Sequence, residues 1–178
     1  ARAAAESGAL VTLIAGPVVL STPESVERVD VVSADEMLEA AQLHGAGCDI
    51  FVGAAAVADY RPATVSGQKI KKSEDRIVFD LMKNPDVIAT MAVMEQRPTL
   101  VIGFAAETEK MHEHARGKLL KKSLDFVIAN DVSRSDIGFN SDLNCVSVID
   151  HTSCTELPLA NKSVLAKRLF DMLASRLS

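Results

Sequence analysis

The stretch Cys48-Asp49-Ile50-Phe51-Val52-Gly53-Ala54-Ala55-Ala56 decides the fold. It is almost continuously apolar, which is typical of a strand buried on both faces of a parallel sheet. The small residues at its carboxyl end let a ligand approach the backbone amides closely. Tight packing of a helix on the sheet explains the same residues and is the more ordinary interpretation. The stretch therefore predicts a buried parallel strand whose end is a candidate ligand site.

Strand-sized apolar runs alternate with helical patterns along the rest of the chain, which indicates an α/β protein with a parallel sheet. A helix is expected to start at Ser33, because Ser33-Ala34-Asp35-Glu36 has the spacing of a capping box. Another is expected after Asn84-Pro85-Asp86, with Asn84 as its cap and Pro85 as its first residue. The other expected strands are 9–15, 29–32, 100–106, 126–129 and 144–150, and the later expected helices are 108–122 and 161–177.

One region breaks this alternation. Residues 68–72 and 76–82 alternate polar and apolar side chains on either side of Ser73-Glu74-Asp75, which predicts an exposed β-hairpin. The sequence thus predicts an α/β fold, a Rossmann-like doubly wound and mostly parallel sheet with an inserted β-hairpin flap. Residues 1–178 are expected to form a single domain.

The composition narrows the classes of function. The 178 residues carry a formal net charge of −5, with 48% hydrophobic and 24% charged residues, as in ordinary globular domains. An acidic chain argues against general nucleic-acid binding, and no apolar run reaches the roughly 18 residues that span a membrane. The cysteines at positions 48, 145 and 154 have no C-x-x-C spacing. They fit a reducing cytoplasm better than a disulfide framework or a zinc site.

Several charged residues are candidates for binding an anionic ligand. Asp59 follows the decisive strand and can accept hydrogen bonds from ribose hydroxyls, although a lone Asp is more often a cap or a surface charge. Lys69 opens a Lys-Ile-Lys-Lys run in the expected hairpin, where lysines also protect strand edges from aggregation. Lys118 and Lys122 lie one helical turn apart, where like charges repel each other. Their favourable interaction with the helix C-terminus can offset this repulsion without any ligand.

Other catalytic motifs are missing from the sequence. It contains neither a G-x-x-x-x-G-K-[ST] phosphate loop nor a complete G-x-G-x-x-G fingerprint. His112 and His114 are two residues apart on an expected helix, so they point in different directions and cannot share a metal. The serines lie in no nucleophile-elbow pattern. Serine-hydrolase and metal-hydrolase functions are therefore excluded.

Six blocks in order, covering essentially the whole chain, resemble the bacterial phosphopantothenoylcysteine synthetase family, also called phosphopantothenate–cysteine ligase. The longest block is Gly53-Ala54-Ala55-Ala56-Val57-Ala58-Asp59-Tyr60-Arg61-Pro62. The others are Lys69-Ile70-Lys71-Lys72, Lys83-Asn84-Pro85-Asp86, Gly103-Phe104-Ala105-Ala106-Glu107-Thr108, Ala129-Asn130-Asp131-Val132 and Gly138-Phe139-Asn140-Ser141-Asp142.

The resemblance implies a ligase of coenzyme A biosynthesis that joins 4'-phosphopantothenate to cysteine. CTP activates the carboxylate as an acyl-cytidylate with release of pyrophosphate, Mg²⁺ is required, and the cysteine amine then displaces CMP. The family is dimeric, so a homodimer is expected. In bacteria this domain commonly follows a flavin-dependent decarboxylase, so FMN is expected only if such a domain is fused to the chain.

The family's functional residues map onto this sequence position by position. The resemblance makes Lys69 the catalytic flap lysine. It places Ala129, Asn130 and Asp131 near the dimer-forming and active-site region. The residues that would border CTP are Gly53, Ala54, Ala55, Asp59, Pro85, Asp86, Val87, Ile88, Phe104, Lys118 and Lys122.

The chain departs from the family at its start. The family has a Gly-rich segment ending in a pattern like Gly-Lys-Met-Gly, with a functional Asn upstream, and this sequence begins after both. We therefore expect the domain to be N-terminally incomplete. Two other functions stay open: a dinucleotide-dependent oxidoreductase on the same fold, and a non-catalytic nucleotide-binding or dimerisation module.

Overall fold

The computed structural model describes residues 1–69, 77–107, 110–131 and 141–177. None of the helices within these ranges is long and apolar enough to cross a membrane. In chain order the elements are α1 (Arg2–Glu6), β1 (Val11–Ala15), β2 (Val26–Asp30), α2 (Ala34–Gly45), β3 (Ile50–Gly53), β4 (Tyr60–Pro62), β5 (Leu81–Lys83), α3 (Val87–Val93), β6 (Leu100–Glu107), α4 (Met111–Lys121), β7 (Phe126–Asp131), β8 (Leu143–Ile149), β9 (Cys154–Asn161) and α5 (Lys162–Ala174).

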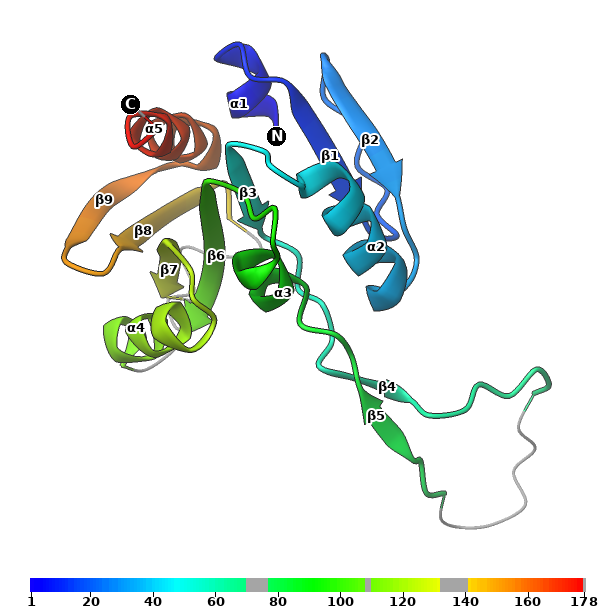
Figure 1. The fold of residues 1–178 in the computed structure, drawn as a ribbon. Coiled ribbons are helices and arrows are strands. Elements are labelled where there is room, and N and C mark those ends of the chain that lie inside the picture. The colour runs from blue at the N-terminus through cyan, green and yellow to red at the C-terminus, as the bar shows by residue number, and fades with distance from the viewer. Residues whose placement is uncertain (70–76, 108–109, 132–140, 178) are drawn as a thin grey trace.

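Parallel strands form the centre of the molecule (Figure 1). Within the described residues, a five-stranded sheet has the order β3-β6-β7-β8-β9. Strands β3, β6 and β7 are parallel, whereas β8 and β9 are antiparallel. Strands β1 and β2 pair in parallel as a second sheet. The expected mostly parallel α/β architecture is confirmed, with an antiparallel edge added to it.

Strand β7 shows how helices cover both faces of the sheet. Val127 and Ala129 belong to a core with residues of α3 and α4, whereas Phe126 and Ile128 belong to a core with residues of α5. All four side chains are buried. Successive strand residues point to opposite faces, so an uninterrupted apolar strand requires a helix on each side. This explains the doubly wound arrangement.

The start of α2 follows its sequence pattern. The Ser33 hydroxyl accepts a hydrogen bond from the Glu36 nitrogen at 3.1 Å, and the Glu36 carboxylate accepts one from the Val32 nitrogen at 2.7 Å. These bonds satisfy backbone donors that have no partner within the helix. The predicted cap at Ser33 is confirmed.

The start of α3 differs from its prediction. Asp86, not Asn84, is the N-cap, and its Oδ1 accepts a hydrogen bond from the Ala89 nitrogen at 3.2 Å. Asp and Asn are about equally good caps, so an Asn-Pro-Asp sequence offers two candidates for one helix start. The prediction for Asn84 was wrong, and its side chain makes other contacts, described below.

Strand β9 was not predicted, because β8 was taken as the last strand. It pairs antiparallel with β8, from Ile149↔Cys154 to Leu143↔Asn161. Most of its residues are exposed, and it contains Pro158. Proline has no amide to donate and is tolerated on edge strands. An exposed edge strand needs no alternating apolar pattern, so the sequence did not indicate it.

The base of the inserted arm is a short antiparallel pair. Strands β4 and β5 run from Tyr60↔Lys83 to Pro62↔Leu81 and extend away from the sheet (Figure 1). Strand β5 shares only Leu81 and Met82 with the expected strand 76–82, and β4 precedes the expected strand 68–72 in the sequence. Gln68 and Lys69 lie in irregular structure, and residues 70–76 fall outside the described part of the chain.

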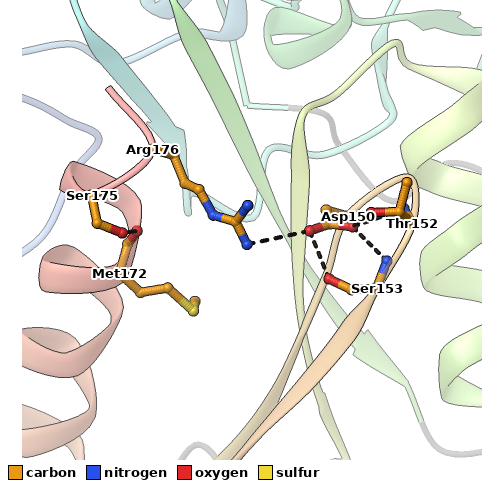
Figure 2. A network of polar contacts seen from close by, with 6 residues as sticks. All are labelled: Asp150, Thr152, Ser153, Met172, Ser175 and Arg176. Carbon is orange, nitrogen blue, oxygen red and sulfur yellow. Dashed lines mark hydrogen bonds and ion pairs between the residues drawn. The ribbon is translucent and has the colours of Figure 1, made fainter. Parts of the chain in front are cut away.

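Asp150 organises the turn between β8 and β9. Its Oδ1 accepts hydrogen bonds from the nitrogens of Thr152 (2.8 Å) and Ser153 (2.6 Å), and its Oδ2 accepts one from Ser153 Oγ (2.7 Å). Arg176 extends toward this carboxylate, with its Nη2 at 3.7 Å from Oδ2 (Figure 2). Burial alone would raise the pKa of Asp150, but the bonds from Ser153 and Thr152 outweigh it and lower the pKa to about 2.

Asp150→Ala is expected to lower the free energy of unfolding by about 1–2 kcal/mol at neutral pH, because the turn amides lose their acceptor. A carboxylate with a lowered pKa stabilises the fold above its ordinary pKa of 3.8, and this stabilisation is lost as the pH falls toward 2. The difference between parent and variant in urea unfolding should therefore shrink between about pH 4 and pH 2. Asp171→Ala is the control, since the Asp171 carboxylate lies on the exposed surface of α5 and pairs with Lys167. A pH-independent loss in Asp150→Ala would contradict this account.

Candidate functional site

Two glycines on neighbouring strands of the sheet pack against α3. Gly53 ends β3 and is in register with Gly103 of β6. A Cβ at Gly53 would come within 2.7 Å of Ile88 Cδ1, and one at Gly103 within 3.1 Å of the same atom. Both glycines therefore allow Ile88 to pack closely on the sheet. For Gly53 this is the ordinary packing explanation, and it also brings the start of α3 close to the strand ends.

Asp86 and Lys122 join α3 to the end of α4. Lys122 follows the last residue of α4, and its Nζ lies 2.7 Å from Asp86 Oδ2. Burial alone would raise the pKa of Asp86. The hydrogen bonds from Lys122 and the Ala89 amide, together with the charges of Lys122 and Lys118, outweigh burial and lower it. The carboxylate is therefore held ionised between two cations.

Lys118 is the second cation near the Asp86 carboxylate. Its Nζ donates a hydrogen bond to the Phe104 carbonyl of β6, and its Cε lies 3.8 Å from the position of a Cβ at Gly103. The Lys118 ammonium therefore lies at the backbone of β6, close to Gly103. The structure thus brings Asp86, Lys118 and Lys122 together near Phe104, and their role in binding a nucleotide stays a prediction.

The loop after β3 borders this group. Ala54, Ala55 and Asp59 are exposed, so their backbone and the Asp59 carboxylate are accessible to a ligand. The carbonyl of Asp59 accepts a hydrogen bond from the Asn84 nitrogen at 2.9 Å. The two segments on either side of the arm, the loop after β3 and the residues leading into α3, are therefore joined at the base of the arm. Pro85 and Val87 belong to the second segment.

Lys69 lies apart from this group, on the arm. It is exposed and precedes residues 70–76, which fall outside the described residues. Its position on an extension of the β4–β5 pair explains why it contributes little to the core. Its role in catalysis is taken up below as a proposal.

Ala129 and Asn130 lie at the carboxyl end of β7, followed by Asp131. Ala129 is buried, and it lines a cavity of about 390 Å³ together with Met111, Ser147 and Leu157. Ser147 is the bonding partner of His112, with their Oγ and Nε2 atoms 3.2 Å apart. The third candidate region therefore borders a hollow between α4, β8 and β9.

A polar network at the base of the arm was not predicted from the sequence. Arg61 Nη1 donates to Asn84 Oδ1 at 2.7 Å, and Asn84 Nδ2 donates to the Ala58 carbonyl at 2.8 Å. Arg61 Nη2 also lies 3.1 Å from Asp35 Oδ2 of α2. Arg61 and Asn84 are polar residues at the β4–β5 pair, and this was the signal for a contact between them. The preference of Asn for helix caps instead led to the prediction that Asn84 caps α3.

A metal site built by the protein alone is not found in the described ranges, where no three His, Cys, Asp or Glu side chains are grouped closely enough to hold an ion.

The family model of the DNA/pantothenate metabolism flavoprotein C-terminal domain matches residues 1–177. The chain belongs to this family. Its relatives include the coenzyme A biosynthesis bifunctional protein CoaBC of Escherichia coli K12, which is 45% identical over 179 residues, and that of Vibrio cholerae, which is 44% identical over 175 residues. These matches cover 99% and 97% of this chain but only 44% of each relative. The chain thus spans less than half the length of these relatives.

Two solved structures have the same fold. The C-terminal domain of CoaBC matches with a TM-score of 0.81 and 33% identity, covering 99% of this chain and 79% of that structure. A variant of Cab2 in complex with phosphopantothenate-cysteine matches with a TM-score of 0.64 and 15% identity, covering 86% of this chain and 53% of that one. At this identity the second match supports the fold alone.

Proposed function

We propose that this domain is the phosphopantothenate–cysteine ligase of coenzyme A biosynthesis and that it uses CTP. The proposal is supported by the relatives, which are named coenzyme A biosynthesis bifunctional proteins. The observation that carries it is the pair Lys118 and Lys122, held beside Asp86 at the start of α3. Two ammonium groups converging next to a small-residue strand end are suited to a triphosphate.

The reaction has two steps. A carboxylate oxygen of 4'-phosphopantothenate attacks the α-phosphorus of CTP, the bond to the bridging oxygen breaks, and pyrophosphate leaves. The cysteine amine then attacks the acyl carbon, the bond to the cytidylate oxygen breaks, and CMP leaves as the amine loses a proton. Each step moves negative charge onto phosphate oxygens, and fixed cations stabilise charge that develops in this way.

The candidate residues take distinct positions in this reaction. Lys118 and Lys122 neutralise the triphosphate, and Asp59 accepts hydrogen bonds from the ribose hydroxyls. Lys69 meets the reacting carbonyl or phosphate from the arm. The nucleotide is bordered by Gly53, Ala54, Ala55, Pro85, Val87, Ile88 and Phe104.

The proposed reaction also implies Mg²⁺ as a cation and restricts FMN to another domain. Mg²⁺ enters with CTP, because phosphate oxygens are the hard ligands that it prefers. When bound, it would neutralise triphosphate charge beside Lys118 and Lys122. FMN would belong to a fused decarboxylase domain.

The functional protein is a homodimer in this proposal, with Ala129, Asn130 and Asp131 near the shared region. Large apolar side chains on the described part of the arm support a protein partner, since exposed apolar patches commonly mark interfaces. Tyr60, Phe79 and Leu81 are 55%, 59% and 53% exposed. The activity is placed in the cytoplasm, where the free thiols of the three cysteines would stay reduced.

The full-length natural protein that contains this chain is expected to use CTP far better than ATP. The measurement is kcat/KM for each nucleotide with 4'-phosphopantothenate and cysteine, following pyrophosphate release and the phosphopantothenoylcysteine product. Omitting cysteine is the control, because product formation requires the amine. Equal use of CTP and ATP would contradict the nucleotide assignment, and no product with either would contradict the proposed function.

A further inference from the structure

Asn84 makes three hydrogen bonds at the base of the arm, one to strand β4 and two to the loop that precedes it. Its Oδ1 accepts from Arg61 Nη1 of β4 at 2.7 Å, and its Nδ2 donates to the Ala58 carbonyl at 2.8 Å. Its backbone nitrogen donates to the Asp59 carbonyl at 2.9 Å. The residue entering α3 therefore holds two consecutive carbonyls of the loop that follows β3.

The chemistry of the partners requires an amide at this position. A guanidinium is only a donor and a carbonyl is only an acceptor, so the side chain between them must accept on one side and donate on the other. The orientation of the Asn84 amide is fixed by this requirement. A carboxylate would satisfy Arg61 and repel the Ala58 carbonyl, and a serine would be too short to reach both.

The backbone of Asn84 is restricted as well. A residue before proline is driven into the extended region, and Pro85 follows directly. This conformation continues the register Tyr60↔Lys83 by one more backbone bond, from Asn84 to Asp59. Both the main chain and the side chain of Asn84 thus act on the same short segment.

We infer that Asn84 is a positioning residue for the nucleotide: by holding Ala58 and Asp59, it aims the Asp59 carboxylate at the bound ribose. The inference rests on the proposed function, because it takes the nucleotide site from that proposal. Arg61 orients the Asn84 amide and is itself anchored by Asp35 at the start of α2. Asn84 does not touch the reacting atoms in this account.

The test is Asn84→Asp in the full-length natural protein, with Asn161→Asp as the matched control. Asn161 caps α5, and its Oδ1 only accepts, from Ser163, so Asp replaces it without loss. Asn84→Asp should raise KM for CTP by about tenfold or more, which corresponds to the loss of one well-placed hydrogen bond. The kcat at saturating CTP should stay within about threefold, and KM for cysteine should not change, because a misaimed ribose acceptor weakens binding more than chemistry.

A second measurement keeps the inference separate from the proposed function. Amide hydrogen exchange, read over peptides spanning 54–62, should speed up in Asn84→Asp and remain at the parent rate in Asn161→Asp. A parent protein that does not turn over CTP would contradict the proposed function. Unchanged exchange of residues 54–62 in Asn84→Asp would contradict the positioning of the loop by Asn84, whether or not the parent is active. With an active parent, an unchanged KM for CTP in folded Asn84→Asp would overturn the inference. An equal worsening of kcat, every KM and the melting temperature would do the same, because it indicates a general structural role.

Discussion

Lys69→Gln is expected to lower kcat by about 10²–10³ while the protein melts like its parent. Lys69 is exposed on the arm, and surface substitutions usually change stability by no more than about 0.5 kcal/mol. Its ammonium can meet charge that develops only in the transition state, and loss of such a preorganised donor typically costs about 10²–10³ in kcat. CTP binding should weaken only modestly. The measurements are pyrophosphate release, calorimetry with CTP and a thermal melt.

Neighbouring lysines provide the control for this effect. Lys71→Gln and Lys72→Gln remove the same charge two and three residues further along the chain, and the family resemblance singles out the first lysine of the run. Their turnover should fall much less. Near-normal turnover in Lys69→Gln would show that Lys69 is an ordinary solvated surface charge.

Lys122→Ala is expected to weaken CTP binding roughly tenfold or more, since a hydrogen bond to a charged group contributes about 1.5–3 kcal/mol. Its Nζ lies 2.7 Å from Asp86 and retains two donors for phosphate oxygens. The variant also leaves the Asp86 carboxylate without its closest cation, which adds repulsion of the triphosphate. Calorimetry should show a larger loss at low salt than at high salt, because salt screens exposed charges.

Lys121→Ala is the matched control for Lys122→Ala. Lys121 is the last residue of α4 and is exposed, so the two variants remove the same charge one residue apart. Asp59→Asn should weaken binding as well, through the ribose rather than the phosphates. An unchanged CTP affinity in both Lys122→Ala and Asp59→Asn would show that these residues are structural and that the site lies elsewhere.

The centre of the fold could be predicted because its pattern is local and strong. The strand at Ile50–Gly53 is almost uniformly apolar, and the cap at Ser33 is set by residues within one helical turn. The predicted burial of this strand on both faces was wrong: β3 ends the five-stranded sheet of the described residues, and Val52 is 47% exposed. Its apolar pattern still indicated a strand, and the reciprocal cap still indicated the helix start. These elements therefore lie close to where the sequence placed them.

The site could be predicted only in part, since its contacts join distant segments. Positive charge at Lys118 and Lys122 is visible in the sequence, but their partners are Phe104 and Asp86 on other elements. The contact between Arg61 and Asn84 likewise crosses the arm. Strand propensity and helix-cap preference describe local structure and cannot predict a contact between distant residues. Asn84 was therefore predicted as a helix cap, and its bond to Arg61 was not predicted.

The most direct test of the central claim follows one oxygen atom. 4'-Phosphopantothenate labelled with ¹⁸O in its carboxylate is incubated with CTP, Mg²⁺, cysteine and the full-length natural protein, and the released CMP is analysed by mass spectrometry. An acyl-cytidylate transfers one carboxylate oxygen to the α-phosphorus, so each CMP should carry one ¹⁸O while the pyrophosphate carries none. Unlabelled CMP, or label in phosphate or pyrophosphate, would contradict the proposed mechanism.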